Sequence, residues 1–176
     1  HPHFCTSVAW CEEGDPRVGV VFDPVRDECF SAVRGGGAYC NGAPISADNA
    51  AGLADAMVAV GFGKFSPDEQ TISDLADLAG RVQKFRITGS AALDVVYTAC
   101  GRISAYCEQQ VYVWDIAAGK VILEEAGGRC ATRRLEGSWQ RACLAASARV
   151  FDELLTFAGL ATRSADETLL AGEQAD

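Results

Sequence analysis

The chain has 176 residues, 49% of them apolar, and a formal net charge of −9. This length can bury the core of one domain or slightly more. Its 15 lysines and arginines are scattered, so no basic stripe can neutralise phosphates, which argues against a nucleic-acid partner. There is no signal peptide and no apolar run near 18 residues, so the sequence predicts a soluble, cytoplasmic protein with no membrane partner.

The eight cysteines are many for a chain of this length. No two of them form a Cys-x-x-Cys pair, and most lie inside apolar patterns such as Ala142-Cys143-Leu144. We therefore expect the cysteines to be small buried hydrophobic side chains of a protein in a reducing compartment. We expect them to form neither a disulfide framework nor a zinc site.

The first 45 residues alternate short β-rich segments with turn signals. Residues 4–11, 17–23 and 28–34 are expected to form antiparallel strands. Glycines 35–37 follow, and the pair Asn41-Gly42 predicts a tight hairpin. A glycine run can cradle phosphate, but neither a helix nor a P-loop lysine follows this one. A hairpin with close backbone approach is the better interpretation.

From residue 54 the pattern changes to alternating strands and helices. Ser66-Pro67-Asp68-Glu69 predicts a helix start, with proline at the first helical position and acids in the first turn. The other expected elements are strands at 56–60, 84–87, 103–108, 129–132 and 142–146, and helices at 90–100, 115–126 and 150–157.

These elements predict an α/β chain with three parts. Residues 1–48 would be the remainder of an N-terminal antiparallel β/α domain, and residues 49–165 a C-terminal α/β/α domain. Residues 166–176 would form a tail.

Asp115 is expected in the first turn of its helix, where the helix dipole stabilises a carboxylate by roughly 0.3–1 kcal/mol. An isolated Asp at this position is usually a cap. However, Ala118 stands where a capping box would need Glu or Gln, and the small residues up to Gly119 permit the close approach that a metal ligand needs.

Glu108 is expected at the end of its strand, on the same face as Ser104 and Tyr106. Alone it would be a solvated carboxylate. Together with Asp115 it could accept hydrogen bonds from a polyhydroxylated ligand.

Gly89 and Ser90 open another helix directly after a strand, so Ser90 is expected to be an N-cap. No Gly-x-Ser-x-Gly elbow surrounds it, and the only histidines, His1 and His3, are expected at a frayed terminus. A serine hydrolase and a zinc site are therefore disfavoured. The remaining interpretation is a Mg²⁺ ion that is bound by carboxylates and acts on an anionic ligand. The ligand would lie in the crevice where two strand-to-helix junctions meet.

The chain also resembles a known family. Residues 114–119, Trp-Asp-Ile-Ala-Ala-Gly, with Glu-Ala-Gly-Gly at 125–128, are similar to the C-terminal signature of the inositol monophosphatase family. The resemblance extends in the same order and spacing from about residue 2 to 155. The other matching segments are 18–24, 34–38, 41–42, 89–94 and 101–108.

The resemblance implies a layered α/β/α/β/α sugar-phosphatase-type fold, here the C-terminal α/β/α unit plus part of the first sheet. It implies a homodimeric, Mg²⁺-dependent, lithium-sensitive phosphatase that hydrolyses inositol monophosphate or a similar small phosphate monoester by attack of a metal-activated water. Asp115 would then bind a metal ion and Glu108 an inositol hydroxyl. Gly89, Ser90 and Ala91 would line the substrate pocket.

The family's Asp-Pro-x-Asp-Gly-Thr motif and its upstream glutamate would lie before His1 and are absent from this sequence. Of the family's metal carboxylates only Asp115 is present, so we expect residues 1–176 alone to be inactive. Two alternatives stay open: a non-catalytic truncated family member acting as a binding module, and a bisphosphate nucleotidase or histidinol-phosphate phosphatase. Glu108 favours the inositol branch over the nucleotidases.

Overall fold

The computed structural model describes residues 2–47, 50–62, 69–135, 139–155 and 169. The N-terminal part forms an antiparallel sheet in which each strand pairs with the next. At its last hairpin Asn41 and Gly42 have φ of 49° and 79°, as a tight two-residue turn requires. This confirms the hairpin predicted from the sequence. The strands are β1 (Thr6–Glu12), β2 (Asp15–Asp23), β3 (Glu28–Val33), β4 (Ala38–Cys40) and β5 (Ala43–Pro44).

The second sheet has the order β7-β6-β8-β10-β9. Strand β6 pairs in parallel with β7 and β8, whereas β10 pairs antiparallel with β8 and β9. The strands are β6 (Met57–Gly61), β7 (Lys84–Arg86), β8 (Ala105–Tyr112), β9 (Gly128–Arg134) and β10 (Gln140–Ser147). The helices are α1 (Glu69–Arg81), α2 (Ala91–Ala99), α3 (Val113–Glu125) and α4 (Phe151–Leu154), with a 3₁₀ turn η1 at Leu53–Asp55.

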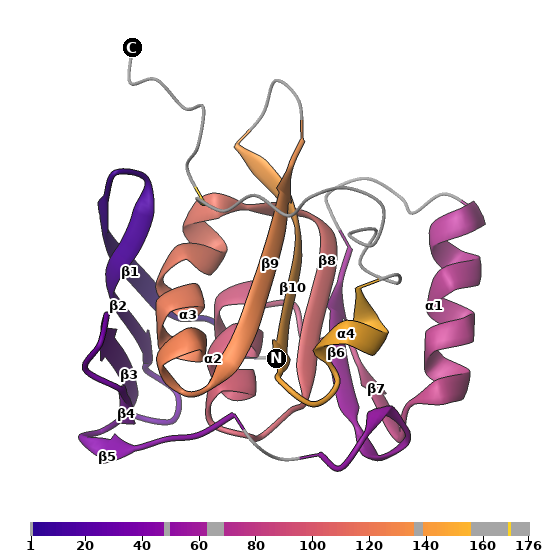
Figure 1. The fold of residues 1–176 in the computed structure, drawn as a ribbon, viewed down its shortest axis with the longest axis horizontal. Helices are drawn as coiled ribbons and strands as arrows, with labels where there is room; N and C mark the ends of the chain where they lie inside the picture. Colours follow the sequence, from indigo (N-terminus) through magenta and orange to yellow (C-terminus); the bar gives the residue numbers. More distant parts are fainter. Residues whose placement is uncertain (1, 48–49, 63–68, 136–138, 156–168, 170–176) are drawn as a thin grey trace.

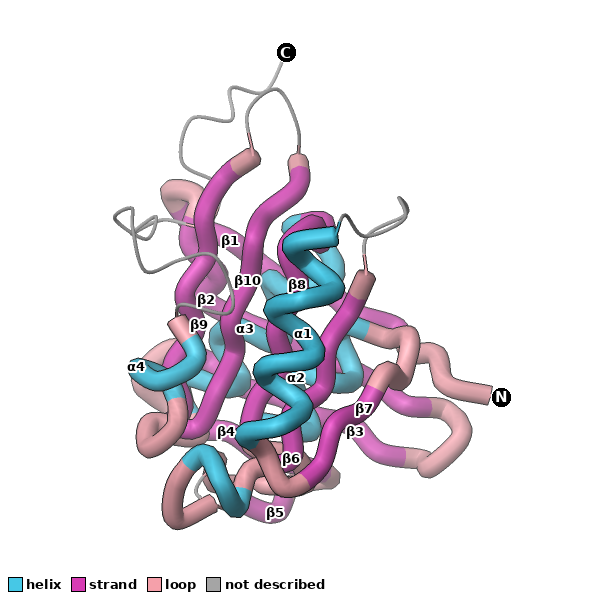
Figure 2. The backbone as a smooth tube through the Cα atoms, turned by 90° about the vertical axis from the view of Figure 1, so that its right-hand side faces the viewer, coloured by secondary structure: helices cyan, strands magenta, loops and turns pink. Residues whose placement is uncertain are grey.

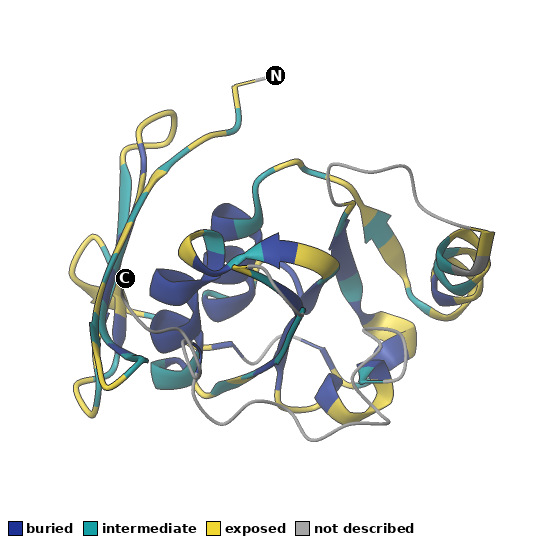
Figure 3. Ribbon diagram, turned by 90° about the horizontal axis from the view of Figure 1, so that it is seen from above, coloured by how far each residue is buried: buried dark blue, intermediate teal, exposed yellow. Residues whose placement is uncertain are grey.

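The described residues stack in four layers, β/α/β/α. Helices α2 and α3 lie between the two sheets, and α1 and α4 cover the far face of the second sheet (Figures 1 and 2). Because sheets cover α2 and α3 on two sides, both helices are apolar almost all round, and Figure 3 shows them largely buried. The α/β class is confirmed, and the second sheet with its helices is the predicted α/β/α unit.

Glycines let α3 pack closely against its neighbours. A Cβ at Gly119 would lie 2.6 Å from Cγ1 of Val95 on α2. A Cβ at Gly19 on β2 would overlap the carbonyl oxygen of Ala118. Both contacts are too short for a real side chain, so these glycines bring α3 against α2 and the first sheet. They thereby fix the helix that carries Asp115.

The expected boundary between the strand that carries Glu108 and the helix that carries Asp115 was wrong. The strand predicted to end at Glu108 continues to Tyr112, and α3 begins immediately afterwards at Val113. The pairing with β6 does end at Glu108, opposite Gly61, but β10 goes on pairing with β8 as far as Tyr112. Glu108 is therefore inside a strand, at the point where one of its two neighbouring strands stops.

All eight cysteines are free; Cys107 and Cys143 are buried and the others half-buried, so burial was overestimated for six of them. The predicted helix-start signal before Glu69 falls outside the described residues, as do positions 156–157 of the predicted closing helix. Within the described residues, no helix is long and apolar enough to cross a membrane.

Candidate active site

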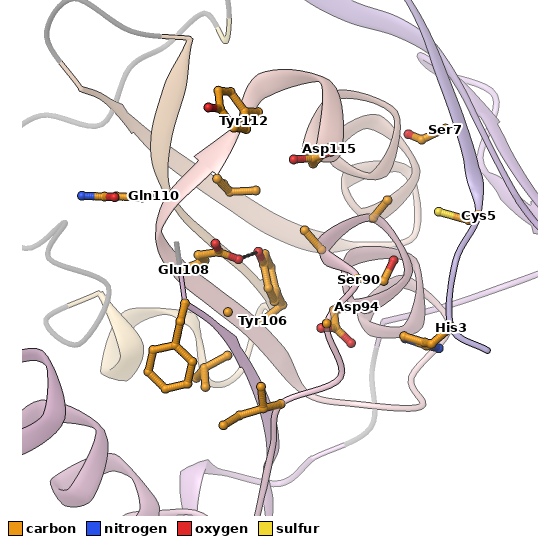
Figure 4. A pocket seen from close by; sticks show the side chains of 18 of the residues that line it. His3, Cys5, Ser7, Ser90, Asp94, Tyr106, Glu108, Gln110, Tyr112 and Asp115 are labelled. Atoms are coloured by element: carbon orange, nitrogen blue, oxygen red, sulfur yellow. Dashed lines mark hydrogen bonds between the residues drawn. The ribbon is translucent and has the colours of Figure 1, made fainter. Parts of the chain in front are cut away.

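A cavity of about 720 Å³ opens where β6 ends beside β8 and where α2 and α3 begin. All five residues that the sequence singled out line it, and Figure 4 shows the labelled side chains around it. They arrive from three places in the chain: Glu108 from the middle of β8, Asp115 from the first turn of α3, and Gly89, Ser90 and Ala91 from the start of α2.

Glu108 is half-buried and bound to a neighbour on its own strand. The hydroxyl of Tyr106 donates a 2.5 Å hydrogen bond to Oε2 of Glu108. The two residues are two positions apart, so they share the face that points toward the cavity, as the alternation in the sequence predicted. Burial raises the pKa of Glu108; the Tyr106 hydrogen bond opposes this rise, and the charge of Asp115 adds to it.

Asp115 stands in the first turn of α3 and is half-buried. Its side chain points into the cavity from the side of the helix, facing the strand that carries Glu108 (Figure 4). A carboxylate at this end of a helix is favoured by the free N–H groups of the first turn. The position therefore suits a negatively charged side chain.

Asp94 is a third carboxylate of the cavity, which the sequence analysis did not single out. It is buried in α2, where Oδ2 accepts a 2.6 Å hydrogen bond from the hydroxyl of Thr88. Oδ1 has no hydrogen-bond partner in the described part of the chain. Burial raises the pKa of Asp94 to about 6, with the Thr88 hydrogen bond opposing and the charge of Glu108 adding. Its place four residues after Ser90, on the same helix face, was the available signal.

The turn that opens α2 has the conformation its sequence requires. Gly89 has φ +89°, a conformation that glycine adopts more readily than other residues. Ser90 is the N-cap residue of α2, as expected, and has an extended backbone, although its hydroxyl makes no capping bond to the helix. Burial raises the pKa of the Cys5 thiol, and the interaction with the Ser90 hydroxyl opposes this rise. Both residues line the cavity, so the turn faces the segment that leads into β1.

The far wall of the cavity comes from His3, Cys5 and Ser7, which alternate along the chain into β1. The expectation that His3 is frayed was wrong, because it is half-buried with its ring 6.0 Å from that of Tyr97. Burial lowers the pKa of His3, and the charge of Arg26 lowers it further. No sequence signal could place this wall before the first sheet was assembled.

Aromatic side chains form one rim of the cavity. Tyr112 and Trp114 stack with ring centroids 4.7 Å apart and planes 10° apart, and Trp114 is 55% exposed. The ring centroids of Trp139 and Trp114 are 6.4 Å apart. Aromatic side chains together with a few polar groups are the usual lining of a pocket that binds a small molecule.

The side chains of the cavity provide only part of a binding site for a cation such as Mg²⁺. Carboxylate oxygens such as those of Asp115 are the ligands that Mg²⁺ prefers. However, within the described residues no group of three or more His, Cys, Asp or Glu side chains is close enough together to hold a metal ion. Asp115 can therefore supply one ligand of such a site, not a complete set.

Comparison with known proteins gives one consistent result. The profile of the "Inositol monophosphatase family" matches residues 1–164. The protein "Nus factor SuhB" of Xylella fastidiosa is 42% identical over 132 residues, which are 72% of this chain and 47% of that protein. The chain thus spans about half the length of this curated relative.

Solved structures agree with the sequence comparison. The inositol monophosphatase from Anabaena (Nostoc) sp. PCC 7120 matches with a TM-score of 0.80 and 34% identity, over 89% of this chain and 64% of that one. Mycobacterium tuberculosis SuhB matches with a TM-score of 0.80 and 32% identity, over 90% and 66% of the two chains.

Proposed function

Because this chain belongs to the inositol monophosphatase family, we propose that its protein is a phosphoric monoester hydrolase that removes phosphate from inositol monophosphate or a similar small polyol phosphate. The observation that carries the proposal is the cavity in which Glu108, Asp115 and the turn at residues 89–91 converge. These residues come from separate elements. The site brings together carboxylate oxygens, which can accept hydrogen bonds from hydroxyl groups, and the N-terminus of a helix.

In this proposal Glu108 accepts a hydrogen bond from a substrate hydroxyl that does not react. The turn from Gly89 to Ala91 lines the pocket for the substrate at the start of α2, where free backbone N–H groups favour negative charge. Asp115 would supply a carboxylate ligand to a metal ion. The chemistry that Mg²⁺ supplies in such sites is polarisation of the phosphate and activation of a water molecule.

We also propose that residues 1–176 on their own do not turn over substrate. Asp115 offers one carboxylate, and no cluster of three potential ligands is found within the described residues. One or two carboxylates do not compete well with the water shell of Mg²⁺ unless further ligands or substrate phosphates join them.

The proposal is tested by phosphate release from myo-inositol 1-phosphate, using the protein at its full natural length. We expect turnover that requires Mg²⁺, stops with a chelator and is inhibited by lithium. The same assay on residues 1–176 should give no turnover. Hydrolysis that is indifferent to chelation would contradict the metal-dependent proposal.

Substrate choice is the open part of the proposal. The rim of Tyr112 and Trp114 could also stack on a nucleobase or an imidazole ring, so a nucleotide 3′-phosphate and histidinol phosphate belong in the same assay. Glu108 favours the polyol, since its carboxylate accepts hydrogen bonds that hydroxyl groups donate. The lowest KM should therefore belong to the inositol ester.

A non-catalytic binding module is the second candidate. The incomplete ligand set within the described residues favours it, and so does the word "factor" in the name of the Xylella fastidiosa relative. An absence of turnover in the full-length protein with every ester would select it. The expectations of a homodimer, of no nucleic-acid partner and of a cytoplasmic location stay predictions. Light scattering, a nucleic-acid binding assay and cell fractionation respectively would test them.

A further inference from the structure

The last residue of β6 is a glycine that faces the proposed substrate-binding carboxylate. Gly61 stands opposite Glu108 in the parallel pairing of β6 with β8. A Cβ at position 61 would overlap Oε2 and Cδ of Glu108 and lie 3.1 Å from its Cγ. The carboxyl group of Glu108 therefore occupies the space that any side chain at position 61 would take.

The backbone does not require glycine at this position. Gly61 is in a strand and is not among the described glycines with positive φ. Glycine also weakens a strand relative to alanine, because it loses more conformational freedom on folding. The close approach of Glu108 is the feature of the structure that requires position 61 to lack a side chain.

The opposite side of the carboxylate is fixed as well. The Tyr106 hydroxyl donates to Oε2, the same oxygen that lies against Gly61. Tyr106 is 1% exposed and cannot follow Glu108 if the carboxylate moves. Oε1 accepts no hydrogen bond from any residue that the structure describes and is left for a ligand.

We propose that Gly61 is a positioning residue for substrate recognition: the empty space at its Cα, together with the Tyr106 hydroxyl, sets the orientation in which Glu108 accepts a substrate hydroxyl. The inference rests on the proposed function. It adds that the affinity for the polyol depends on a residue that contributes no side-chain atom to the site.

The test is Gly61→Ala in the protein at its full natural length. The new methyl group displaces the flexible end of Glu108 and breaks its bond to Tyr106, while the strand itself tolerates alanine. The KM for inositol 1-phosphate should rise about tenfold, as expected for a lost hydrogen bond to a charged group. The value of kcat should change little, since the hydroxyl does not react. The melting temperature should fall by no more than the loss of the Tyr106–Glu108 hydrogen bond explains.

A double-mutant cycle separates positioning from a structural effect. In a Glu108→Ala background there is no carboxylate to displace, so Gly61→Ala should change KM by less than about twofold. Gly80→Ala is the matched control, because a Cβ at Gly80 on α1 meets nothing within 4 Å. It should leave KM and kcat unchanged.

The outcomes are distinguishable. If Gly61→Ala leaves the KM of an active protein unchanged, the inference is overturned and the proposed function stands. The same conclusion follows if Gly61→Ala raises KM equally with and without Glu108. If the wild-type protein hydrolyses no polyol phosphate, the proposed function fails and the inference fails with it.

Discussion

The hydroxyl of Tyr106 lies 2.5 Å from Oε2 of Glu108, and both side chains project from the same face of β8. This pair determines which carboxylate oxygen of Glu108 is left for a ligand. Because Tyr106 is buried and Glu108 is half-buried at the cavity wall, the pair connects the core with the proposed substrate site.

We predict that Tyr106→Phe weakens substrate binding more than turnover. The change removes one donor and leaves Oε2 of Glu108 without its bond, at a cost of about 1 kcal/mol. The pKa of Glu108 should rise further, since the Tyr106 bond opposes the effect of burial. Carbon-13 NMR of the Glu108 carboxyl against pH would measure this shift. A pKa that falls in the variant would contradict this assignment of the hydrogen bond.

Asp94→Asn should stabilise the protein at neutral pH. The folded protein keeps the Asp94 proton up to about pH 6, whereas the unfolded chain releases it near pH 3.8. Folding stability is therefore lost as the pH rises through this window and stays lower above it. About two pKa units correspond to on the order of 2–3 kcal/mol, which the uncharged amide avoids.

Thermal unfolding of Asp94→Asn and the wild type should be compared at pH 3 and pH 7.5. The variant should gain its stability at pH 7.5 and have little advantage at pH 3. Asp77→Asn, at an exposed position of α1, is the control and should show no pH-dependent difference of this size. Equal stability of Asp94→Asn and the wild type at both pH values would contradict the high pKa of Asp94.

Glu125 links the last turn of α3 to the first sheet. Its carboxylate accepts backbone hydrogen bonds from Gly35 and Gly37, each 2.9 Å long. These bonds, the Gly35 bond first, hold the pKa of Glu125 below its usual value. The stability they contribute is present above the unfolded pKa near 4.5 and is lost as the pH falls through the lower folded pKa.

Glu125→Gln should therefore destabilise the protein by about 2 kcal/mol at neutral pH, because hydrogen bonds to a charged acceptor are lost. The loss should shrink in acid, when Glu125 itself is protonated. Chemical denaturation at pH 7 and below pH 3 measures both values. An unchanged midpoint at pH 7 would show that this contact contributes nothing to the stability of the fold.

Much of the fold could be predicted because local signals agreed with the final packing. Asn41-Gly42 specified its hairpin, and the alternating residues from Ala105 to Glu108 specified a strand face. The end of β8 could not be predicted, because pairing with β10 extends it to Tyr112. The division of the chain at residues 48 and 49 stays a prediction.

The candidate site was predictable only in part, for a physical reason. Glu108 and Asp115 stand near strand-to-helix junctions, and such positions are visible in a sequence. The roles of Asp94 and Gly61 depend on which residues meet across elements, as in the pairing of Gly61 with Glu108. No local pattern encodes that register.

We propose that the cavity is a metal-dependent phosphatase site in which Asp115 binds the metal ion. The most direct measurement is the turnover of inositol 1-phosphate by the full-length protein and its Asp115→Asn variant across a Mg²⁺ titration, with Asp77→Asn as the control. We predict a loss of at least about a hundredfold in kcat for Asp115→Asn with little change in the melting temperature, because Asp115 would hold the metal ion whose charge stabilises the transition state, and losing that stabilisation costs several kcal/mol. Wild-type turnover by Asp115→Asn at limiting Mg²⁺ would contradict the proposed role of Asp115 as a metal ligand.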